Sequence, residues 1–271
     1  MDTDLPADAY RTRPDPFVTD RGDGPPILFA HGTLMDRTMF APQMAALTPE
    51  YRAAAFDFRA RTEFWQGPYD LDDLVADTLG VADGLWMDAP VLAGMSMGGF
   101  TALRYALQHP DRLSGLVLID SAAEPHGEAD REQYRAMVED LPEADRVSRG
   151  LAEASAHFLF GETTTEQHPN LVERWVSRWE TYVPEAVHHE VHSWLDRPDV
   201  ADRLDEIDVP TLVVHGEEDR SLPIEGAERM AEAIPDAELA RIPEAGHTST
   251  LENPDAVSTA IETFLDRVYE V

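Results

Sequence analysis

The sequence predicts an α/β protein with a mostly parallel central sheet flanked by helices, and three observations predict this fold. Strand-sized apolar runs alternate with amphipathic helical patterns, which is typical of a parallel sheet covered on both faces. The length of 271 residues suits one such domain with a modest insertion, and the 43% hydrophobic share is enough for a full core. A long stretch without strands, residues 123–203, indicates where the insertion lies.

Each predicted strand is a short apolar run bounded by turn-forming or polar residues. Strands are predicted over residues 27–30, 53–58, 90–93, 116–119, 211–214 and 237–242. The first follows a turn rich in Gly and Pro and ends at His31-Gly32, and the fifth follows Pro210. The sixth is the most polar, which predicts a position near an edge of the sheet.

Helices are predicted where apolar residues recur at helical spacing between these strands. They cover residues 71–85, 97–108, 224–234 and 254–269. Residues 123–203 are acidic and helical in pattern, so we assign residues 1–122 and 204–271 to the α/β core and 123–203 to a helical cap, or lid. An insertion between two strands of an open sheet lies over their C-terminal ends, where α/β active sites are found.

The charge of the chain is strongly negative. Asp and Glu number 53 against 21 basic residues, all of them arginine, and the formal net charge is −32. Such a surface repels itself in dilute salt, whereas at molar salt the Debye length falls to about 3 Å and most of the repulsion is screened. We interpret the chain as salt-adapted, of haloarchaeal type. Nucleic acid and anionic membranes are poor partners for a field of this sign.

The sequence also predicts where the protein is located and which cysteine chemistry it lacks. The first residues are acidic where a secretory signal needs basic ones, and no apolar run approaches the roughly 20 residues that span a bilayer. We therefore expect a cytoplasmic location. The chain has no cysteine, which excludes disulfides and thiolate metal sites.

Ser96 is the candidate nucleophile. It lies in Gly94-Met95-Ser96-Met97-Gly98, directly after a predicted strand and before a predicted helix. This is the setting of a nucleophile elbow, a strained turn that lifts the serine hydroxyl clear of the sheet. The glycines allow neighbouring backbone to approach the turn.

A serine hydroxyl needs a base, and the base needs a carboxylate to orient it. We assign the base to His247, in a loop between the last predicted strand and the final helix, and the carboxylate to Asp219, after the strand at 211–214. The chain order is then Ser, Asp, His, as in α/β-hydrolases. Glu217, Glu218 and Asp120 are rivals for the carboxylate role.

Two backbone N–H groups are candidates for stabilising a developing oxyanion. The Thr33 N–H follows the predicted strand that ends at His31-Gly32, and the Met97 N–H lies at the start of the helix after Ser96. Donors aimed at such a charge contribute about 3–4 kcal/mol each.

The substrate pocket is expected to combine residues near these loops with residues of the cap. His31, Leu34 and Met95 flank the predicted chemistry. Trp175 and Trp179 are four residues apart and share a helical face, where they either line the pocket or pack the cap onto the core.

No metal or organic cofactor is expected. His188, His189 and His192 lie close together, but they do not form the His-Glu-x-x-His zinc motif and no separate carboxylate partner is evident. A solvated or cap-packing histidine cluster explains them better.

The motifs together resemble the α/β-hydrolase superfamily from about residue 25 to the C-terminus. The resemblance rests on the His31-Gly32 loop, the Gly-Met-Ser-Met-Gly-Gly elbow, His109-Pro110-Asp111-Arg112, and the Gly-Glu-Glu-Asp and Ala-Gly-His loops, which occur in family order. Within the superfamily the chain looks like small bacterial-type carboxylesterases and 3-oxoadipate enol-lactonase-like hydrolases. The resemblance implies the fold, the triad and a lid, and the retained His31-Gly32 favours a simple ester.

The expected reaction is hydrolysis of a small to medium carboxylic ester or lactone, EC class 3.1.1, through an acyl-enzyme on Ser96. Hydrolysis of a carbon–carbon bond in a ring-cleavage product and acyl transfer to another acceptor use the same triad and are alternatives. A ligand-binding protein that retains a hydrolase pocket is the alternative outside enzymes. The sequence does not indicate an oligomeric state.

Overall fold

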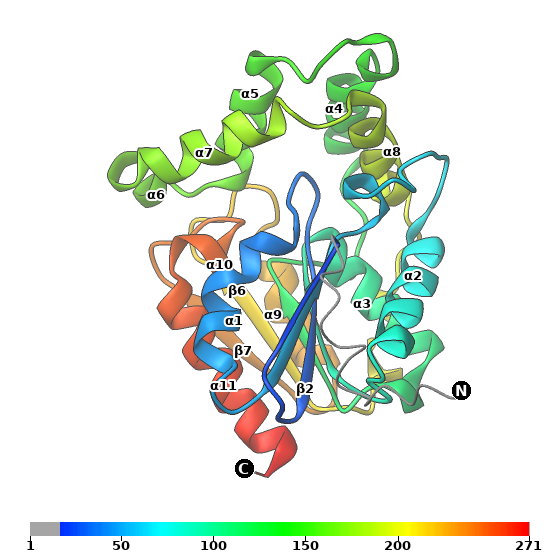
Figure 1. Ribbon diagram of the computed structural model, residues 1–271, viewed down its shortest axis with the longest axis vertical. Coiled ribbons are helices and arrows are strands. Elements are labelled where there is room, and N and C mark those ends of the chain that lie inside the picture. Colours follow the sequence, from blue (N-terminus) through cyan, green and yellow to red (C-terminus); the bar gives the residue numbers. More distant parts are fainter. Residues whose placement is uncertain (1–16, 271) are drawn as a thin grey trace, which may run out of the picture.

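The computed structural model describes residues 17–270 as a seven-stranded sheet with helices on both faces (Figure 1). The strand order is β1-β3-β2-β4-β5-β6-β7, and neighbours are parallel except β1 and β3, which are antiparallel. The strands are β1 (Val18–Arg21), β2 (Pro26–Ala30), β3 (Arg52–Phe56), β4 (Val91–Met95), β5 (Gly115–Ile119), β6 (Thr211–Gly216) and β7 (Ala237–Ile242). The predicted fold class is confirmed, and β7 lies at an edge as its polarity predicted.

The strand boundaries follow from local hydrogen bonding. The strand predicted at 53–58 ends at Phe56, because the Phe58 N–H donates to His31 Nε2 at 3.0 Å instead of to a neighbouring strand. β1 was not predicted, since its Val-Thr-Asp-Arg sequence is short, polar and half exposed. Strand β1 pairs with β3 from Val18 opposite Phe56 to Arg21 opposite Ala53.

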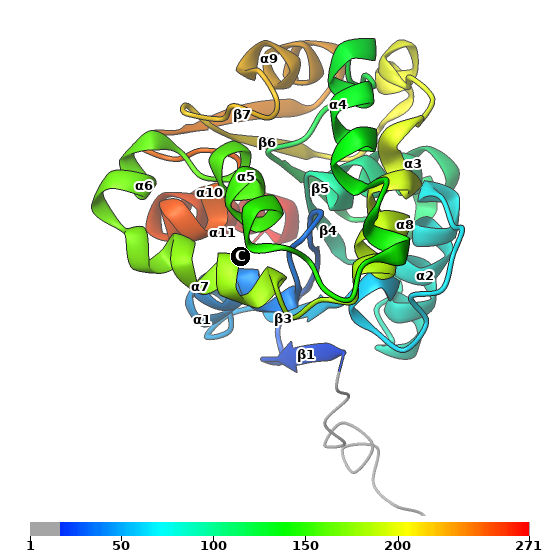
Figure 2. The same ribbon diagram turned by 90° about the horizontal axis from the view of Figure 1, so that it is seen from above.

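Helices of the core cover the two faces of the sheet. They are α1 (Ala41–Leu47), α2 (Leu71–Gly84), α3 (Met97–Gln108), α9 (Ile224–Ala233), α10 (Ser249–Glu252) and α11 (Pro254–Tyr269). Helices α1 and α11 pack together on one face, and α2 and α3 pack together on the other (Figure 2). Asp70 begins α2 with a capping box to Asp73, and Asn253 caps α11 just before Pro254 at its first position.

Five further helices lie between β5 and β6 and are called the cap helices below. They are α4 (Glu128–Val138), α5 (Arg149–Leu159), α6 (Glu162–Gln167), α7 (Pro169–Trp179) and α8 (Pro184–Leu195). They lie beyond the C-terminal ends of the parallel strands, at the top of Figure 1. Helix α4 packs against α8, and α5 packs against α7.

Short 3-10 helices complete the connections. They are η2 (Arg37–Phe40), η3 (Arg59–Arg61), η4 (Pro110–Arg112), η5 (Leu141–Glu143) and η6 (Ala201–Glu206). None of the helices within residues 17–270 has the length and apolarity to cross a membrane.

Candidate active site

The turn between β4 and α3 holds Ser96 in a strained conformation. Its φ of 50° and ψ of −113° lie outside the regions that residues with a side chain normally occupy. The turn is fixed because the Ser96 N–H donates to the Ile119 carbonyl at 2.9 Å and Ser121 Oγ donates to the Ser96 carbonyl at 3.1 Å. A Cβ on Gly98 would lie 2.1 Å from the Ala30 carbonyl oxygen, so this close approach requires glycine.

Ser96, His247 and Asp219 form one hydrogen-bonded series. Ser96 Oγ lies 2.9 Å from His247 Nε2, and His247 Nδ1 lies 2.7 Å from Asp219 Oδ2. The other oxygen of Asp219 accepts the N–H groups of Ser221 and Leu222 at 2.7 and 3.0 Å. The carboxylate is therefore held in place, and His247 can carry its proton on Nδ1 while Nε2 accepts from Ser96.

Two of the rival carboxylates are engaged elsewhere, and the third is exposed. Glu218 accepts the N–H and hydroxyl of Thr163 at 2.8 and 2.5 Å, and Glu217 is exposed. Asp120 accepts the Gly216 N–H at 2.9 Å and the N–H and hydroxyl of Ser249 at 3.1 and 2.6 Å. Asp219 is thus the carboxylate that the fold brings to His247.

Electrostatics favour a basic His247. Burial opposes its charged form, but the charge of Asp219 and its hydrogen bond outweigh burial and raise the pKa of His247 above the ordinary 6.5. Burial and the neighbouring Asp219 raise the pKa of Asp120 to about 8, so this second carboxyl group takes up a proton near neutral pH. Asp219 then carries the negative charge opposite the imidazole.

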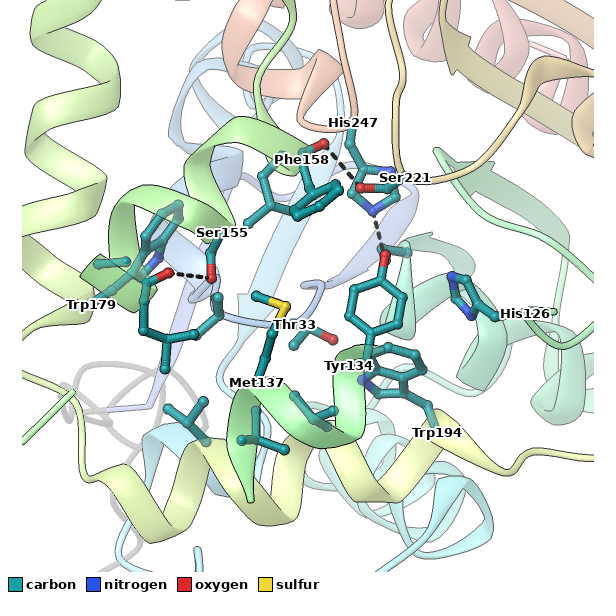
Figure 3. Close-up of a pocket in the computed structure, with 18 of the residues that line it drawn as sticks. Thr33, His126, Tyr134, Met137, Ser155, Phe158, Trp179, Trp194, Ser221 and His247 are labelled. Atoms are coloured by element: carbon teal, nitrogen blue, oxygen red, sulfur yellow. Dashed lines mark hydrogen bonds between the residues drawn. The ribbon is translucent and has the colours of Figure 1, made fainter. Parts of the chain in front are cut away.

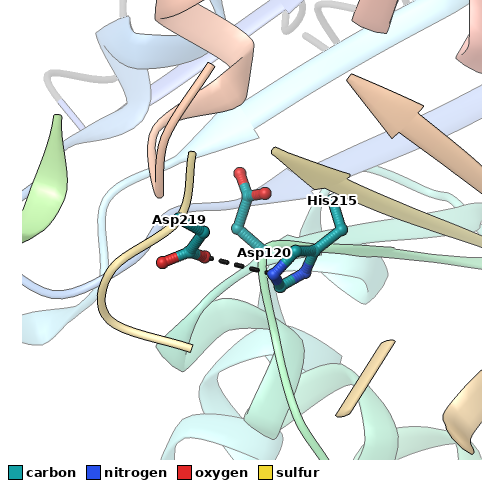
Figure 4. Close-up of side chains that lie close together, drawn as sticks. All are labelled: Asp120, His215 and Asp219. Atoms are coloured by element: carbon teal, nitrogen blue, oxygen red, sulfur yellow. Dashed lines mark ion pairs between the residues drawn. The ribbon is translucent and has the colours of Figure 1, made fainter. Parts of the chain in front are cut away.

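Asp120, His215 and Asp219 form the one group of potential metal ligands found within residues 17–270 (Figure 4). Each offers an atom within 4.8 Å of the others. Asp120 and Asp219 already accept backbone N–H groups as described, and His215 Nε2 lies 2.9 Å from the Leu222 carbonyl. These hydrogen bonds hold the loop that carries Asp219 in place.

The loop after β2 passes directly beside Ser96. A Cβ on Gly32 would lie 2.4 Å from Met95 Sδ and 3.1 Å from Ser96 Cβ, so only glycine allows this approach. Across residues 17–270, neither the Thr33 N–H nor the Met97 N–H has a hydrogen-bond partner. Both groups are therefore available to a ligand.

A buried ion pair connects this loop to the cap. Glu190 of α8 accepts the Leu34 N–H at 3.1 Å and Arg61 Nη2 at 2.7 Å, and Arg61 Nε donates to the Met35 carbonyl at 3.0 Å. Both charged side chains are almost fully buried. Leu34 itself has a φ of 64°, so the carboxylate of a cap helix holds the loop in a conformation that is unusual for leucine.

A largely apolar cavity lies over Ser96, with about 790 Å³ of space not filled by atoms, part of it open to solvent (Figure 3). Ser96, His247, Thr33, Leu34 and Trp179 line it. Its apolar wall comes mainly from the cap helices and includes Met137, Leu151, Phe158, Val191 and Trp194.

Three residues predicted for the pocket lie away from its wall. His31 is fully buried, with Nδ1 bonded to the Gly32 carbonyl at 2.8 Å, and burial and the charge of Arg61 lower the pKa of His31 to about 4. It is a neutral support for the loop. Met95 is buried in β4 beneath the elbow, and Trp175 packs on Trp179 with ring centroids 6.5 Å apart.

Several residues at or near the cavity were not predicted from the sequence. Glu190 adjoins the histidine cluster of α8. The spacing of the histidines suggested a metal site, and no local pattern indicated that this carboxylate holds the Leu34 loop. His126 and Tyr134 line the cavity from the segment after β5 and from α4. Trp194 is a third tryptophan of the cap, and it could have indicated from the sequence that the cavity has an aromatic wall.

Comparisons with known proteins agree with this architecture. A model of the alpha/beta hydrolase fold family matches residues 25–254. The AB hydrolase superfamily protein YisY of Bacillus subtilis is 29% identical over 261 residues, which cover 92% of this chain and 94% of that protein.

Two solved structures are similar throughout. A thermophilic esterase from Thermogutta terrifontis, with malate bound, is 33% identical and has a TM-score of 0.87 over 93% of both chains. The enol-lactonase from Burkholderia xenovorans LB400 is 26% identical, with a TM-score of 0.83 over 92% of this chain and 95% of its own. With the family model matching most of its length, the chain belongs to the alpha/beta hydrolase fold family.

Proposed function

We propose that this hydrolase cleaves a small to medium carboxylic ester, or a lactone, through an acyl-enzyme on Ser96. The observation that carries the proposal is the unbroken series from Ser96 Oγ through His247 to Asp219, at 2.9 and 2.7 Å, facing an apolar cavity. The similarity to an esterase and to an enol-lactonase supports the same class of bond, since both names describe hydrolysis of an ester linkage.

The reaction proceeds in two acyl-transfer steps. His247 takes the Ser96 proton as Oγ attacks the ester carbonyl, and the oxyanion accepts the N–H groups of Thr33 and Met97. His247 then gives the proton to the leaving alkoxide, which leaves the acyl group on Ser96. The same imidazole takes a proton from water as it attacks the acyl-enzyme, and His247 returns that proton to Ser96 Oγ as the carboxylic acid leaves.

The cavity wall favours a substrate whose side groups are mainly apolar. No Asp, Glu or Arg side chain is among the described residues that line it. The cap helices form most of the cavity wall above the nucleophile, so we expect them to limit the length of the acyl and alcohol groups.

A panel of p-nitrophenyl esters tests the proposal. We expect kcat/KM to be higher for butanoate and hexanoate than for dodecanoate, because the cap limits chain length. Assays belong at molar KCl, since the net charge of −32 opposes compaction in dilute buffer. A folded protein that hydrolyses none of these esters would contradict the proposal, and turnover of a dienol diketone instead would select carbon–carbon bond hydrolysis.

The pH dependence of kcat/KM should report His247. The base acts only when neutral, so activity is full above its pKa and is lost as the pH falls through it. Because Asp219 raises this pKa above 6.5, the acid limb should lie above 6.5 in the free enzyme. A profile from about pH 5 to pH 9 measures it. A limb well below the ordinary histidine value would contradict the assignment.

A further inference from the structure

His126 is a polar group on the cavity wall that the proposed mechanism does not use. It follows β5 and lines the same cavity as Ser96 and His247 (Figure 3). Aromatic rings surround it: the centroids of Tyr134 and Trp194 lie 5.2 and 5.3 Å from that of His126. A histidine among aromatic side chains at a substrate cavity is a candidate for substrate recognition.

The tautomer of His126 is set by Arg197. The guanidinium Nη1 lies 3.1 Å from His126 Nδ1, and because a guanidinium only donates, Nδ1 must accept. The remaining proton is then on Nε2. Burial, followed by the charges of Arg197 and His247, lowers the pKa of His126 to about 3, so the ring stays neutral.

The Nε2–H group is free to bind a ligand. It has no hydrogen-bond partner among residues 17–270, and it is not one of the polar atoms sealed from solvent. Two serine hydroxyls of the cavity wall are occupied: Ser155 donates to the Leu151 carbonyl at 2.9 Å, and Ser221 donates to the Phe158 carbonyl at 2.9 Å.

Arg197 is a buried cation without a carboxylate partner in the described part of the chain. It is 5% exposed, donates to the Glu124 carbonyl at 2.7 Å and lies 3.7 Å from the centroid of the Phe100 ring. Burial, with the nearby charge of Arg104, lowers the pKa of Arg197 to about 9. Because this cation donates to His126 Nδ1, it polarises the ring toward donation from Nε2.

We propose that His126, backed by Arg197, forms a subsite for an acceptor oxygen of the substrate, such as an ether, keto or carboxylate oxygen away from the scissile bond. The inference rests on the proposed function, because it names the substrate class of the same cavity. A purely alkyl ester leaves the Nε2–H desolvated and unpaired, whereas an ester with an oxygen at this position pairs it. The expected preference for the oxygen-bearing ester is about ten- to hundredfold in kcat/KM.

Matched substrates test the subsite. Hexanoate esters are compared with 4-methoxybutanoate esters, which replace one methylene by oxygen, and the oxygen is then moved along the acyl chain and into the alcohol. Glutarate monoesters, which end in a carboxylate, distinguish a charged acceptor from a neutral one. The wild type should prefer the oxygen at one position, and the preference should fall to about onefold in His126→Phe, which keeps an aromatic ring without a donor.

Two further variants test whether the loss of preference in His126→Phe is merely a structural effect. His126→Gln retains an N–H donor and should keep part of the preference, while His168→Phe changes an exposed histidine of the cap and should leave it unchanged. Oxygen preferences that survive His126→Phe at every position, or no preference anywhere in an active wild type, would overturn the subsite.

Binding measurements test the subsite independently of ester hydrolysis. The Kd values of hexanamide and 4-methoxybutanamide, with the same oxygen scan, are measured in Ser96→Ala and in Ser96→Ala combined with His126→Phe. If no ester is hydrolysed but the amide preference is present and depends on His126, the proposed function fails and the subsite stands. If esters are hydrolysed and the amides bind equally in both proteins, the subsite fails and the proposed function stands.

Discussion

Replacing Ser96 by alanine is expected to lower kcat/KM for the best ester by at least about 10⁴-fold. The change removes the oxygen that lies 2.9 Å from His247 Nε2 and leaves no atom to form the acyl-enzyme. Alanine keeps the Cβ and the backbone hydrogen bond to Ile119, so the elbow should fold unchanged. Steady-state kinetics with circular dichroism measure both properties.

The control for this variant is a serine far from the site. Ser177 is exposed on α7, where its hydroxyl contacts Glu173. Ser177→Ala should retain wild-type activity. If a folded Ser96→Ala retained more than about a hundredth of the wild-type kcat/KM, Ser96 would not be the nucleophile.

Asp219→Asn should lower kcat by about 10⁴-fold, with a smaller effect on KM. The asparagine oxygen can still accept the N–H groups of Ser221 and Leu222, so the amide NH₂ faces His247 Nδ1. Nδ1 must then accept, and the proton moves to Nε2, where it prevents His247 from taking the Ser96 proton. Loss of the negative charge should also lower the pKa of His247 and shift the acid limb of any residual activity to lower pH.

Asp120 should not substitute for the missing charge. Its oxygens accept the Gly216 N–H and the Ser249 N–H and hydroxyl, and burial, which remains in the variant, still raises its pKa and opposes its charged form. Asp236→Asn, an exposed change next to Arg267, is the matched control and should be active. A loss smaller than about tenfold in Asp219→Asn would show that another group orients the base.

The strands that could be predicted from the sequence are those with a continuous run of apolar residues. The apolar runs of β2, β4, β5 and β6 are buried throughout or nearly so, and buried parallel strands have no polar alternation to obscure them. Strand β1 escaped prediction because an edge strand needs little hydrophobicity. The strand predicted at 53–58 ran too long because the hydrogen bond from the Phe58 N–H to a histidine 27 residues away ends it.

The candidate triad followed from position in sequence, since each residue lies in a loop after a strand and parallel strands bring such loops to one edge. The surroundings of the site depend on contacts between distant segments. Glu190 reaches the Leu34 N–H across 156 residues, and Arg197 reaches His126 across 71. Neither contact leaves a periodic pattern in the sequence, because each depends on how the cap helices pack onto the core. His31 illustrates the same limit: its place beside the catalytic loop was evident, but its burial was not.

The central claim is that Ser96 is an activated nucleophile, and labelling with a fluorophosphonate at molar KCl tests it most directly. The phosphonylated protein is digested and the modified peptide is identified by mass spectrometry. We predict a single adduct on the peptide that contains Ser96, and none in Ser96→Ala. A folded wild-type protein that is not labelled, or that is labelled at a different serine, would contradict the claim.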